Sequence, residues 1–348
     1  MPRARTVVIA FGCLFTLVAR TASAATLLVA PNGVDSGGCG AKSAPCLTIT
    51  RAIANAGIDD TIVVAPGRYG DVDGNATLNL ASEETPNVGG CDCAVEIGKR
   101  VTVVSRDGAA ATVIDAGKAG LHAVRISADG AVFGKKNKGF TLTGASLSNA
   151  GLLITASGTT VTGNVFLDNP GTGTIVSGSR NLIASSRFFG EVDGFLVTGS
   201  DNTITESAAS GTGGFSGSGF SIGGSRNTLH AVFATGNAVG ISLFGTGLVV
   251  TKSVVVRNTI AGIDVAGPGN DATISKTTIH SNAYTTLDNC GLVLSGADTT
   301  AVATGNYWGA PTGPGVDPAD AVCIFTNGIA TTTPFATKEH KTPTKPLR

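Results

Sequence analysis

The chain has 348 residues, with 24 Lys and Arg against 24 Asp and Glu, so its formal net charge is zero. That balance excludes a nucleic-acid binder that works through a strong basic field. Hydrophobic residues make up 42% of the chain and exclude wholesale disorder, while 49 glycines without a G-X-Y period exclude collagen. The composition that remains, aliphatic and rich in Gly, is typical of many short strands joined by tight turns.

The first 24 residues are expected to be a signal peptide. Arg3 and Arg5 form a basic start, residues 6–19 are apolar, and Ala22-Ser23-Ala24 matches an A-x-A cleavage site. The apolar run is shorter than the ~20 residues that a spanning helix needs. We therefore expect a secreted, periplasmic or cell-surface protein with no membrane span after cleavage, and the alternative is an uncleaved anchor.

The region that follows, 25–70, is expected to be a cap of strand, helix and strand. Residues 27–30 and 61–65 alternate as strands, and residues 47–56 carry Ile49, Ala52, Ile53 and Ala56 at helical spacing. A short amphipathic helix at this point would cover the open end of a repetitive core.

Cysteine usage agrees with export, because six cysteines follow the signal segment and an even number suggests three disulfides with 15 possible pairings. Cys39 and Cys46 flank a short turn and form the simplest local pair. Cys290 and Cys323 bracket the C-terminal region. Cys91 and Cys93 remain, and because a bridge across one residue is strained, crossed pairing with Cys39 and Cys46 stays open.

Residues 71–75 resemble the start of a calcium loop, with candidate ligands Asp71, Asp73 and Asn75. An EF-type loop needs Gly at its sixth position and Glu at its twelfth, where this chain has Ala76 and Ser82. We keep calcium as a possible cofactor of a less regular site and expect no other cofactor.

A repeat of about 22 residues occupies the middle of the chain. Seven units begin with the pattern Gly-apolar-x-apolar, at Gly151, Gly173, Gly194, Gly219, Gly240, Gly262 and Gly291. Each unit holds three short strands with alternating apolar residues, separated by turns that often contain Asn. One such unit cannot bury its apolar face alone, so the units must stack.

The repeat predicts an all-β fold, a right-handed parallel β-helix solenoid with the short N-terminal capping helix. In parallel register Phe166 stacks on Phe188, and Phe195 stacks on Phe220. Asn residues at equivalent turns bond to the Asn above and below. An antiparallel sandwich is the alternative.

The end of the chain breaks the repeat. Tyr307, Trp308, Phe325 and Phe335 are expected to cover the last coil, with sugar stacking by Tyr307 and Trp308 as the alternative. The predicted organisation is a signal peptide (1–24), an N-terminal cap (25–70), parallel β-helix coils (71–310), a C-terminal cap (311–337) and a basic disordered tail (338–348).

Two segments carry a resemblance to a known family. The run APNGVDSGGCGAKSAPCLTITRAIANAGIDDTIVVAPGRYG (30–70) resembles the N-terminal cap of secreted right-handed parallel β-helix proteins of the pectin-lyase-like superfamily. NYWGAPTGPG (306–315) and TTPFAT (332–337) resemble their C-terminal closure. The resemblance implies the fold but not one chemistry. The Gly-His-Gly motif of polygalacturonases and the Asp-Pro-His-Glu motif of alginate epimerases are absent, so their catalytic residues cannot be transferred.

Candidate site residues come from outward positions of neighbouring coils. One outward column contains Gly163, Ser185, Glu206, Ala231, Lys252 and Lys276. Lys252 and Lys276 are expected to be neighbours, and two close ammonium groups lower one pKa and make a general base possible. Arg257, Asp264 and His280 lie on the same two coils, so these five residues are the catalytic candidates for a uronic-acid lyase.

Three further groups of residues are weaker candidate sites. Glu206 and His230 form a possible acid/base pair. Glu191 and Asp193, with Asp168 one coil away, are possible carboxylates for glycoside hydrolysis. A basic loop, which can contact an anionic glycan, contains Lys135, Lys136 and Lys138. For each of them a structural or solvated role is the competing interpretation.

The function hypothesis is an exported, monomeric β-helix that binds or processes a polysaccharide or cell-surface glycan, with an anionic polymer expected, without an assignable catalytic motif. Whether it is an enzyme stays open; a polysaccharide lyase is favoured over a glycoside hydrolase. The alternative is a non-enzymatic surface or structural protein, such as an adhesin or a ligand-presenting rod. A charged cleft favours the first hypothesis, and a flat Thr/Ser/Gly surface without a pocket favours the second.

Overall fold

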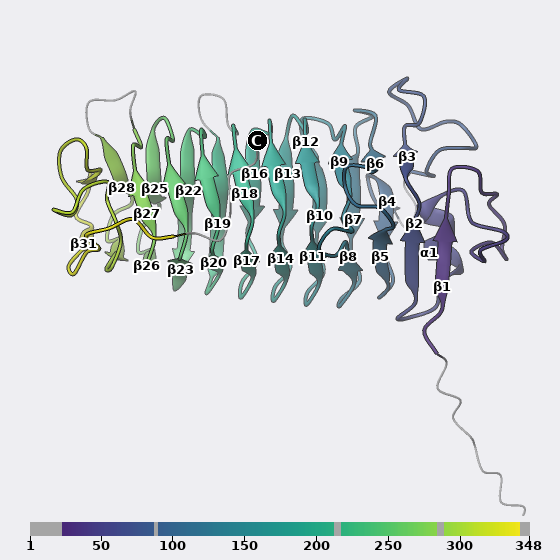
Figure 1. Ribbon diagram of the computed structural model, residues 1–348, viewed down its shortest axis with the longest axis horizontal. Coiled ribbons are helices and arrows are strands. Elements are labelled where there is room, and N and C mark those ends of the chain that lie inside the picture. Colours follow the sequence, from purple (N-terminus) through teal and green to yellow (C-terminus); the bar gives the residue numbers. More distant parts are fainter. Residues whose placement is uncertain (1–22, 87–89, 212–216, 284–288, 342–348) are drawn as a thin grey trace, which may run out of the picture.

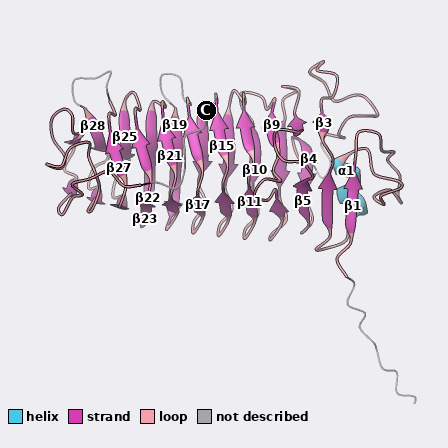
Figure 2. Ribbon diagram, viewed as in Figure 1, coloured by secondary structure: helices cyan, strands magenta, loops and turns pink. Residues whose placement is uncertain are grey.

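The computed structural model describes residues 23–86, 90–211, 217–283 and 289–341. The described chain forms a rod of stacked coils, with the N-terminal cap at one end and the last coils at the other (Figure 1). Nearly all of its regular structure is strand, and the one helix described lies at the N-terminal end (Figure 2). The predicted right-handed parallel β-helix is confirmed. The expected signal segment lies almost wholly outside the described residues.

Three parallel sheets run along the rod, and each coil in its middle part contributes one strand to each sheet. The twelve-stranded sheet contains, in spatial order, β1 (Thr26–Val29), β2 (Thr61–Val64), β5 (Thr102–Ser105), β8 (Val132–Phe133), β11 (Thr160–Thr162), β14 (Leu182–Ala184), β17 (Thr203–Thr205), β20 (Thr228–His230), β23 (Leu248–Thr251), β26 (Asp271–Ser275), β29 (Thr300–Val302) and β31 (Ile329–Thr331).

The ten-stranded sheet contains β30 (Ala321–Ile324), β28 (Cys290–Leu294), β25 (Ala261–Val265), β22 (Val239–Thr246), β19 (Ser218–Ser225), β16 (Asp193–Val197), β13 (Thr172–Val176), β10 (Ala150–Ile154), β7 (His122–Ile126) and β4 (Cys93–Ile97). The nine-stranded sheet contains β27 (Thr278–His280), β24 (Val254–Val256), β21 (Phe233–Thr235), β18 (Ala208–Ser210), β15 (Arg187–Phe189), β12 (Val165–Leu167), β9 (Thr141–Thr143), β6 (Thr112–Asp115) and β3 (Gly67–Gly70).

The core consists of rows of equivalent residues from successive coils. Phe166 pairs in register with Phe188, and their rings stack with centroids 4.7 Å apart. Phe195 pairs with Phe220 as predicted, although their rings are tilted. All four side chains are fully buried. The coil repeat thus places each apolar residue on its equivalent, and this stacking buries the face that a single unit leaves open.

The turns are also stacked. The outward column predicted from sequence is the turn between the twelve-stranded and nine-stranded sheets, and its members have φ between 49° and 75°, the left-handed region: Gly163, Ser185, Glu206, Ala231, Lys252 and Lys276. At a second turn the Asn258 Oδ1 accepts a hydrogen bond from the Asn237 N–H, and the Asn282 Oδ1 accepts one from the Asn258 N–H, each at 3.1 Å. The predicted asparagine ladder is therefore confirmed.

Both ends of the core are covered. Helix α1 (Ile49–Asn55) begins after its N-cap Thr48 and buries Ile49, Ala52 and Ile53 at the N-terminal end. Trp308 is fully buried at the other end, so it serves as a cap and cannot stack on a sugar. The disulfides are Cys39–Cys46, Cys91–Cys93 and Cys290–Cys323. Both simple predicted pairs are confirmed, and Cys91 bonds to Cys93 without crossed pairing.

The start of the segment expected to be a disordered tail contacts the last coils. The His340 N–H donates to the Thr278 Oγ1 at 3.2 Å, and the His340 Nε2 lies 2.8 Å from the Gly305 carbonyl oxygen. Glu339 lies 4.0 Å from the His280 Nε2. The rest of that segment, 342–348, lies outside the described residues.

Candidate functional site

A groove of about 800 Å³ lies on the outer face of the nine-stranded sheet. Its floor is formed by the first residues of four neighbouring strands, Thr141, Val165, Arg187 and Ala208. One wall is the stacked turn with its left-handed residues, and the longer loops before β6 and β9 extend that wall. The residues of the wall include Asp107, Lys136, Asn137, Gly163, Ser185 and Glu206.

The groove is charged and open to solvent. Lys136, Arg187 and Glu206 are exposed, and none of them forms an ion pair within the described part of the chain. Glu206 accepts a hydrogen bond from the Ser185 Oγ at 3.2 Å, which fixes one carboxylate oxygen along the wall. Asp107 is paired with its neighbour Arg106 at 3.1 Å. Two cations therefore remain available to an anionic ligand beside one carboxylate.

The fold explains why these side chains face outward. In β15 the central residue, Phe188, is fully buried, so its neighbour Arg187 points to the opposite face. Glu206 has φ 49° at a turn where the backbone bends sharply. A residue in this conformation projects its side chain from the corner between two sheets, and the Glu206 N–H donates to the His230 carbonyl of the next coil.

The five catalytic candidates from the sequence lie on two turns and two sheets. Lys252 and Lys276 are neighbours on the stacked turn, where the Lys252 N–H donates to the Ser275 carbonyl. Arg257 follows β24, so it lies at the other end of that strand, ~16 Å from Lys252 along an extended backbone. It is grouped with His280, because its N–H donates to the His280 carbonyl oxygen at 3.4 Å.

The electrostatic surroundings of the other two candidates differ. Asp264 belongs to β25 in the ten-stranded sheet, and it accepts a hydrogen bond from the Ser295 Oγ at 2.8 Å. Burial raises the pKa of Asp264 above its ordinary value. Burial lowers the pKa of His280, and nearby Glu339 opposes this shift. The structure thus brings Lys252 to Lys276 and Arg257 to His280, but it does not bring Asp264 to either pair.

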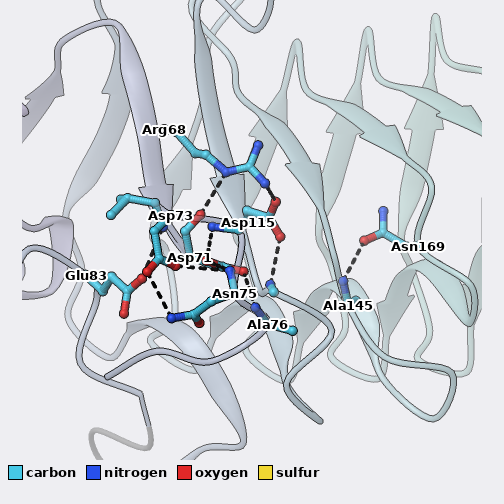
Figure 3. Close-up of polar contacts among 12 residues, drawn as sticks. Arg68, Asp71, Asp73, Asn75, Ala76, Glu83, Asp115, Ala145 and Asn169 are labelled. Atoms are coloured by element: carbon cyan, nitrogen blue, oxygen red, sulfur yellow. Dashed lines mark hydrogen bonds and ion pairs between the residues drawn. The ribbon is translucent and has the colours of Figure 1, made fainter. Parts of the chain in front are cut away.

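The calcium candidates lie in a loop near the N-terminal cap (Figure 3). Oxygens of Asp71, Asp73 and Glu83 lie within 4.8 Å of one another, and Asn75 donates to Asp73 instead of joining that group. Asp71 and Glu83 are buried and accept backbone N–H groups, for example from Gly74 to Asp71 at 2.7 Å.

Every oxygen of these two buried carboxylates has such a donor, from Gly74, Asn75 and Ala76 to Asp71 and from Val72, Asn79 and Leu80 to Glu83. Backbone N–H groups aimed at a carboxylate take over the charge stabilisation that a cation would provide. The geometry therefore explains these acids as the polar core of the loop, and calcium stays a prediction.

The carboxylates weighed for hydrolysis do not face the groove. Glu191 is 2% exposed, and within the described part of the chain neither of its carboxyl oxygens has a well-aligned hydrogen-bond partner. Burial raises the pKa of Glu191 to about 9, and the charge of Asp168 adds to the shift, while the nearby Asn169 side chain opposes it. Glu191 stands in the turn after β15, at the position that Asn169 occupies one coil earlier.

Sequence reasoning found part of the groove and missed its centre. Glu206 and Lys136 were both noticed, in two separate weak sites. Arg187 was missed, although the signal was present: it precedes Phe188, a core residue, so the strand alternation already made it outward. The loop 107–110 could not have been placed without the structure, because its position depends on where the longer turns fold over the sheet.

Comparison with known proteins places the chain in a family. The family model described as "Right handed beta helix region" matches residues 131–307, just over half of the 348 residues. The chain belongs to the right-handed β-helix family. A search of curated protein sequences found no match.

Among solved structures, two polysaccharide lyases match most of this chain. The crystal structure of pectate lyase Pel9A superposes with a TM-score of 0.51 at 17% identity, covering 93% of this chain and 82% of that one. The alginate lyase from Paenibacillus sp. str. FPU-7 gives a TM-score of 0.48 at 17% identity, covering 91% of this chain and 99% of that one. At this level of identity the likeness to the pectate lyase shows the fold and nothing about chemistry. Among the described residues of this β-helix protein, no helix is long and apolar enough to cross a membrane.

Proposed function

We propose that this β-helix protein is exported and that it binds and processes an anionic polysaccharide in the groove over β9, β12, β15 and β18. The observation that carries the proposal is the pair of exposed cations, Arg187 and Lys136, beside Glu206 in an open groove. A solvent-open groove that crosses four strands, with two cations that form no ion pair in the described part of the chain, suits a polymer that carries carboxylates or sulfates. The names of the solved β-helix neighbours, a pectate lyase and an alginate lyase, are compatible with it.

Lyase chemistry fits the groove better than hydrolysis. A β-elimination on a uronic acid needs a base that removes the proton beside the carboxylate and a cation that stabilises the charge that develops there. The proton passes to the base, a C=C bond forms, the C–O bond to the leaving sugar breaks, and the leaving oxygen takes up a proton from solvent, so no water is consumed overall. Glu206 can act as the base and Arg187 or Lys136 as the cation. Lys252 and Lys276, with Arg257, His280 and Asp264, remain the second candidate set.

Export rests on the sequence of the first 24 residues together with the three disulfides, which persist in oxidising compartments. If the protein is exported, it should fold with these three bonds formed. Mass spectrometry of the protein from culture supernatant tests export, and a mature N-terminus at Ala25 is the expected result.

One observation favours the alternative, a non-enzymatic rod. The ten outward positions from β11 to β23 on the twelve-stranded sheet hold no carboxylate, ammonium or guanidinium group, and one of their two rows reads Thr160, Leu182, Thr203, Thr228 and Val249. This is a flat hydroxyl-rich face of the kind expected for a rod. The groove lies on a different sheet, and its presence favours the polysaccharide function.

The test is a panel of pectate, alginate, hyaluronan and xylan, with and without calcium, followed by both unsaturated-product absorbance and reducing ends. Variants Arg187→Ala and Glu206→Gln probe the groove, and Lys252→Ala is matched to them as the probe of the second set. Loss of activity in the groove variants alone supports the groove, and loss in Lys252→Ala alone moves the site to the second set. No binding and no activity on any polymer would leave the rod as the function.

A further inference from the structure

The groove is built in layers, one for each coil that it crosses. Its floor is a row of residues that pair in register from strand to strand: Thr141 in β9, Val165 in β12, Arg187 in β15 and Ala208 in β18. The stacked left-handed turn repeats along the wall with the same spacing, so Gly163, Ser185 and Glu206 stand beside the last three floor residues. Each layer therefore presents its own wall and floor residues to a bound chain.

The first layer, that of β9, contains a cation on its wall. Lys136 belongs to this layer because its loop precedes β9 and lies one coil before Gly163. A Cβ atom on Gly163 would lie 2.5 Å from the Lys135 carbonyl oxygen and 3.5 Å from the Lys136 Cα. The Lys136 side chain is exposed and lines the groove, above the uncharged floor residue Thr141.

The second layer, that of β12, offers an apolar surface. The residues with which it lines the groove are Gly163, Asn164 and Val165, and Asn164 is fully buried. Leu167 lies two residues after Val165 on the same face of the strand and is 40% exposed. Asp168, in the turn that follows, adds a carboxylate and no cation. A negatively charged ligand group therefore finds no partner in this layer.

The third and fourth layers carry opposite charges. Arg187 supplies an exposed cation on the floor of the β15 layer, and the wall residue beside it is Ser185. In the β18 layer Glu206 supplies an exposed carboxylate on the wall, and the floor residue is Ala208. Along the rod the four layers are thus cationic, apolar, cationic and anionic.

The two cationic layers are separated by two coils. The rings of Phe166 and Phe188, which lie under the β12 and β15 layers, are 4.7 Å apart and show the advance of one coil in this part of the rod. The layers of Lys136 and Arg187 are therefore ~10 Å apart. One coil is close to the length of one sugar unit in an extended polysaccharide. A chain that runs along the groove would accordingly place every second sugar in a cationic layer.

We propose that the groove selects a polysaccharide that carries a carboxylate on every second sugar, which means an alternating copolymer of a uronic acid and a neutral sugar. Two carboxylates of such a chain meet Lys136 and Arg187. The neutral sugar between them packs on Val165 and Leu167. The inference rests on the proposed function of the groove and names its substrate class.

A polymer with a carboxylate on every sugar fits the layers less well. In the same register its intermediate carboxylates lie over the apolar β12 layer and beside Glu206, or they turn away to solvent. Over the apolar layer a charge loses solvation, and beside Glu206 it meets a like charge, so neither position provides a partner. The two layers without a cation therefore contribute to specificity together with the two layers that have one.

The test compares two alternating copolymers, hyaluronan and unsulfated chondroitin, with two polymers charged on every sugar, pectate and alginate, as oligosaccharides with equal numbers of sugars. Binding to the mature protein is measured by isothermal titration calorimetry. Charge density alone favours pectate and alginate, whereas we expect one of the alternating copolymers to bind about fivefold more tightly than either of them. Equal or tighter binding of pectate or alginate would overturn the inference and leave the proposed function standing, and no binding of any of the four would overturn both.

A variant tests the order of the layers. Val165→Lys places a cation in the apolar layer and should tighten the binding of pectate and alginate about fivefold, without a comparable gain for the alternating copolymers. The matched control Leu182→Lys adds the same charge at a position that is 39% exposed on the twelve-stranded sheet, and it should change neither class. Equal gains for both classes in Val165→Lys, or the same gains in Leu182→Lys, would show that binding follows net charge and would overturn the inference. Unchanged thermal unfolding checks that both variants fold.

Discussion

Glu191 is expected to make the stability of the protein fall with alkaline pH. It is a buried carboxyl group, and burial raises its pKa from 4.5 to about 9 against the opposing effect of nearby polar groups such as the Asn169 side chain. Between these two values the folded state binds a proton that the unfolded state has released. The stabilisation is therefore complete below pH 4.5, declines as pH rises, and is lost above about pH 9.

Among the raised carboxyls with pKa values of about 6 to 9, Glu191 contributes most between pH 7 and pH 9. Burial raises the pKa of Asp320 to about 6, so its contribution lies largely below pH 7, whereas Glu84, raised to about 7, is half-ionised at pH 7 and completes its smaller remaining contribution just above it. Over two pH units Glu191 contributes at most about 2.7 kcal/mol, at 1.36 kcal/mol per unit. For a chain of this length, 1 kcal/mol corresponds to ~1.5 °C in Tm, which predicts a loss of about 4 °C.

The assay is thermal unfolding of the wild type and Glu191→Gln at pH 7 and pH 9. Gln keeps the shape of the protonated acid and cannot ionise, so its Tm should change about 4 °C less than that of the wild type between the two pH values. Glu206→Gln removes an exposed carboxyl in the next coil and should follow the wild type. If Glu191→Gln loses stability in parallel with the wild type, the reasoning about a buried acid is wrong.

Three further predictions follow from the groove and the ladders. Arg187→Ala should weaken binding of an anionic polymer about tenfold at low salt, and high salt should remove the difference between variant and wild type, measured by affinity electrophoresis; equal salt dependence of the two would contradict the role of Arg187. Asn258→Ala should lower the free energy of unfolding by ~2–5 kcal/mol, because its side chain bonds Asn237, Asn282 and Ala234 inside the core, whereas exposed Asn137→Ala, which gives up only a residue suited to the left-handed backbone at φ 63°, should lower it by ~1 kcal/mol. Asp320→Asn should flatten the pH dependence of stability between pH 4 and 6, because burial raises the pKa of Asp320 to about 6, and the loss of stability with rising pH in that interval should persist in Asp317→Asn.

The fold was accessible from sequence because its signals repeat. Phe166 and Phe188 are 22 residues apart, one coil length, and any parallel stacking of 22-residue units must superpose them. The asparagine ladder was predictable for the same reason, since Asn237, Asn258 and Asn282 recur at the same point of their units. The helix of the cap followed from the spacing of Ile49, Ala52 and Ile53.

The site was harder to predict, because it depends on which sheet each outward side chain belongs to, and the repeat does not fix how residues of different sheets lie relative to one another. Counting from each Gly placed Lys252 and Lys276 in one column correctly. The same counting grouped Asp264 with Arg257, although β25 turns onto another sheet and carries Asp264 away. Arg187 and the loop 107–110 line the same groove because the turn between β5 and β6 folds beside β15. No local sequence pattern predicts such a contact.

The stacked left-handed turn has a consequence for how such a protein can evolve. Each coil meets only the coil before and the coil after it, so one coil can be duplicated or deleted while the cross-section of the rod stays the same. The groove wall would gain or lose one residue of the column at each such event. A duplication or deletion of one coil would therefore first change the length of polymer that the groove binds. The reaction catalysed in the groove would change only later.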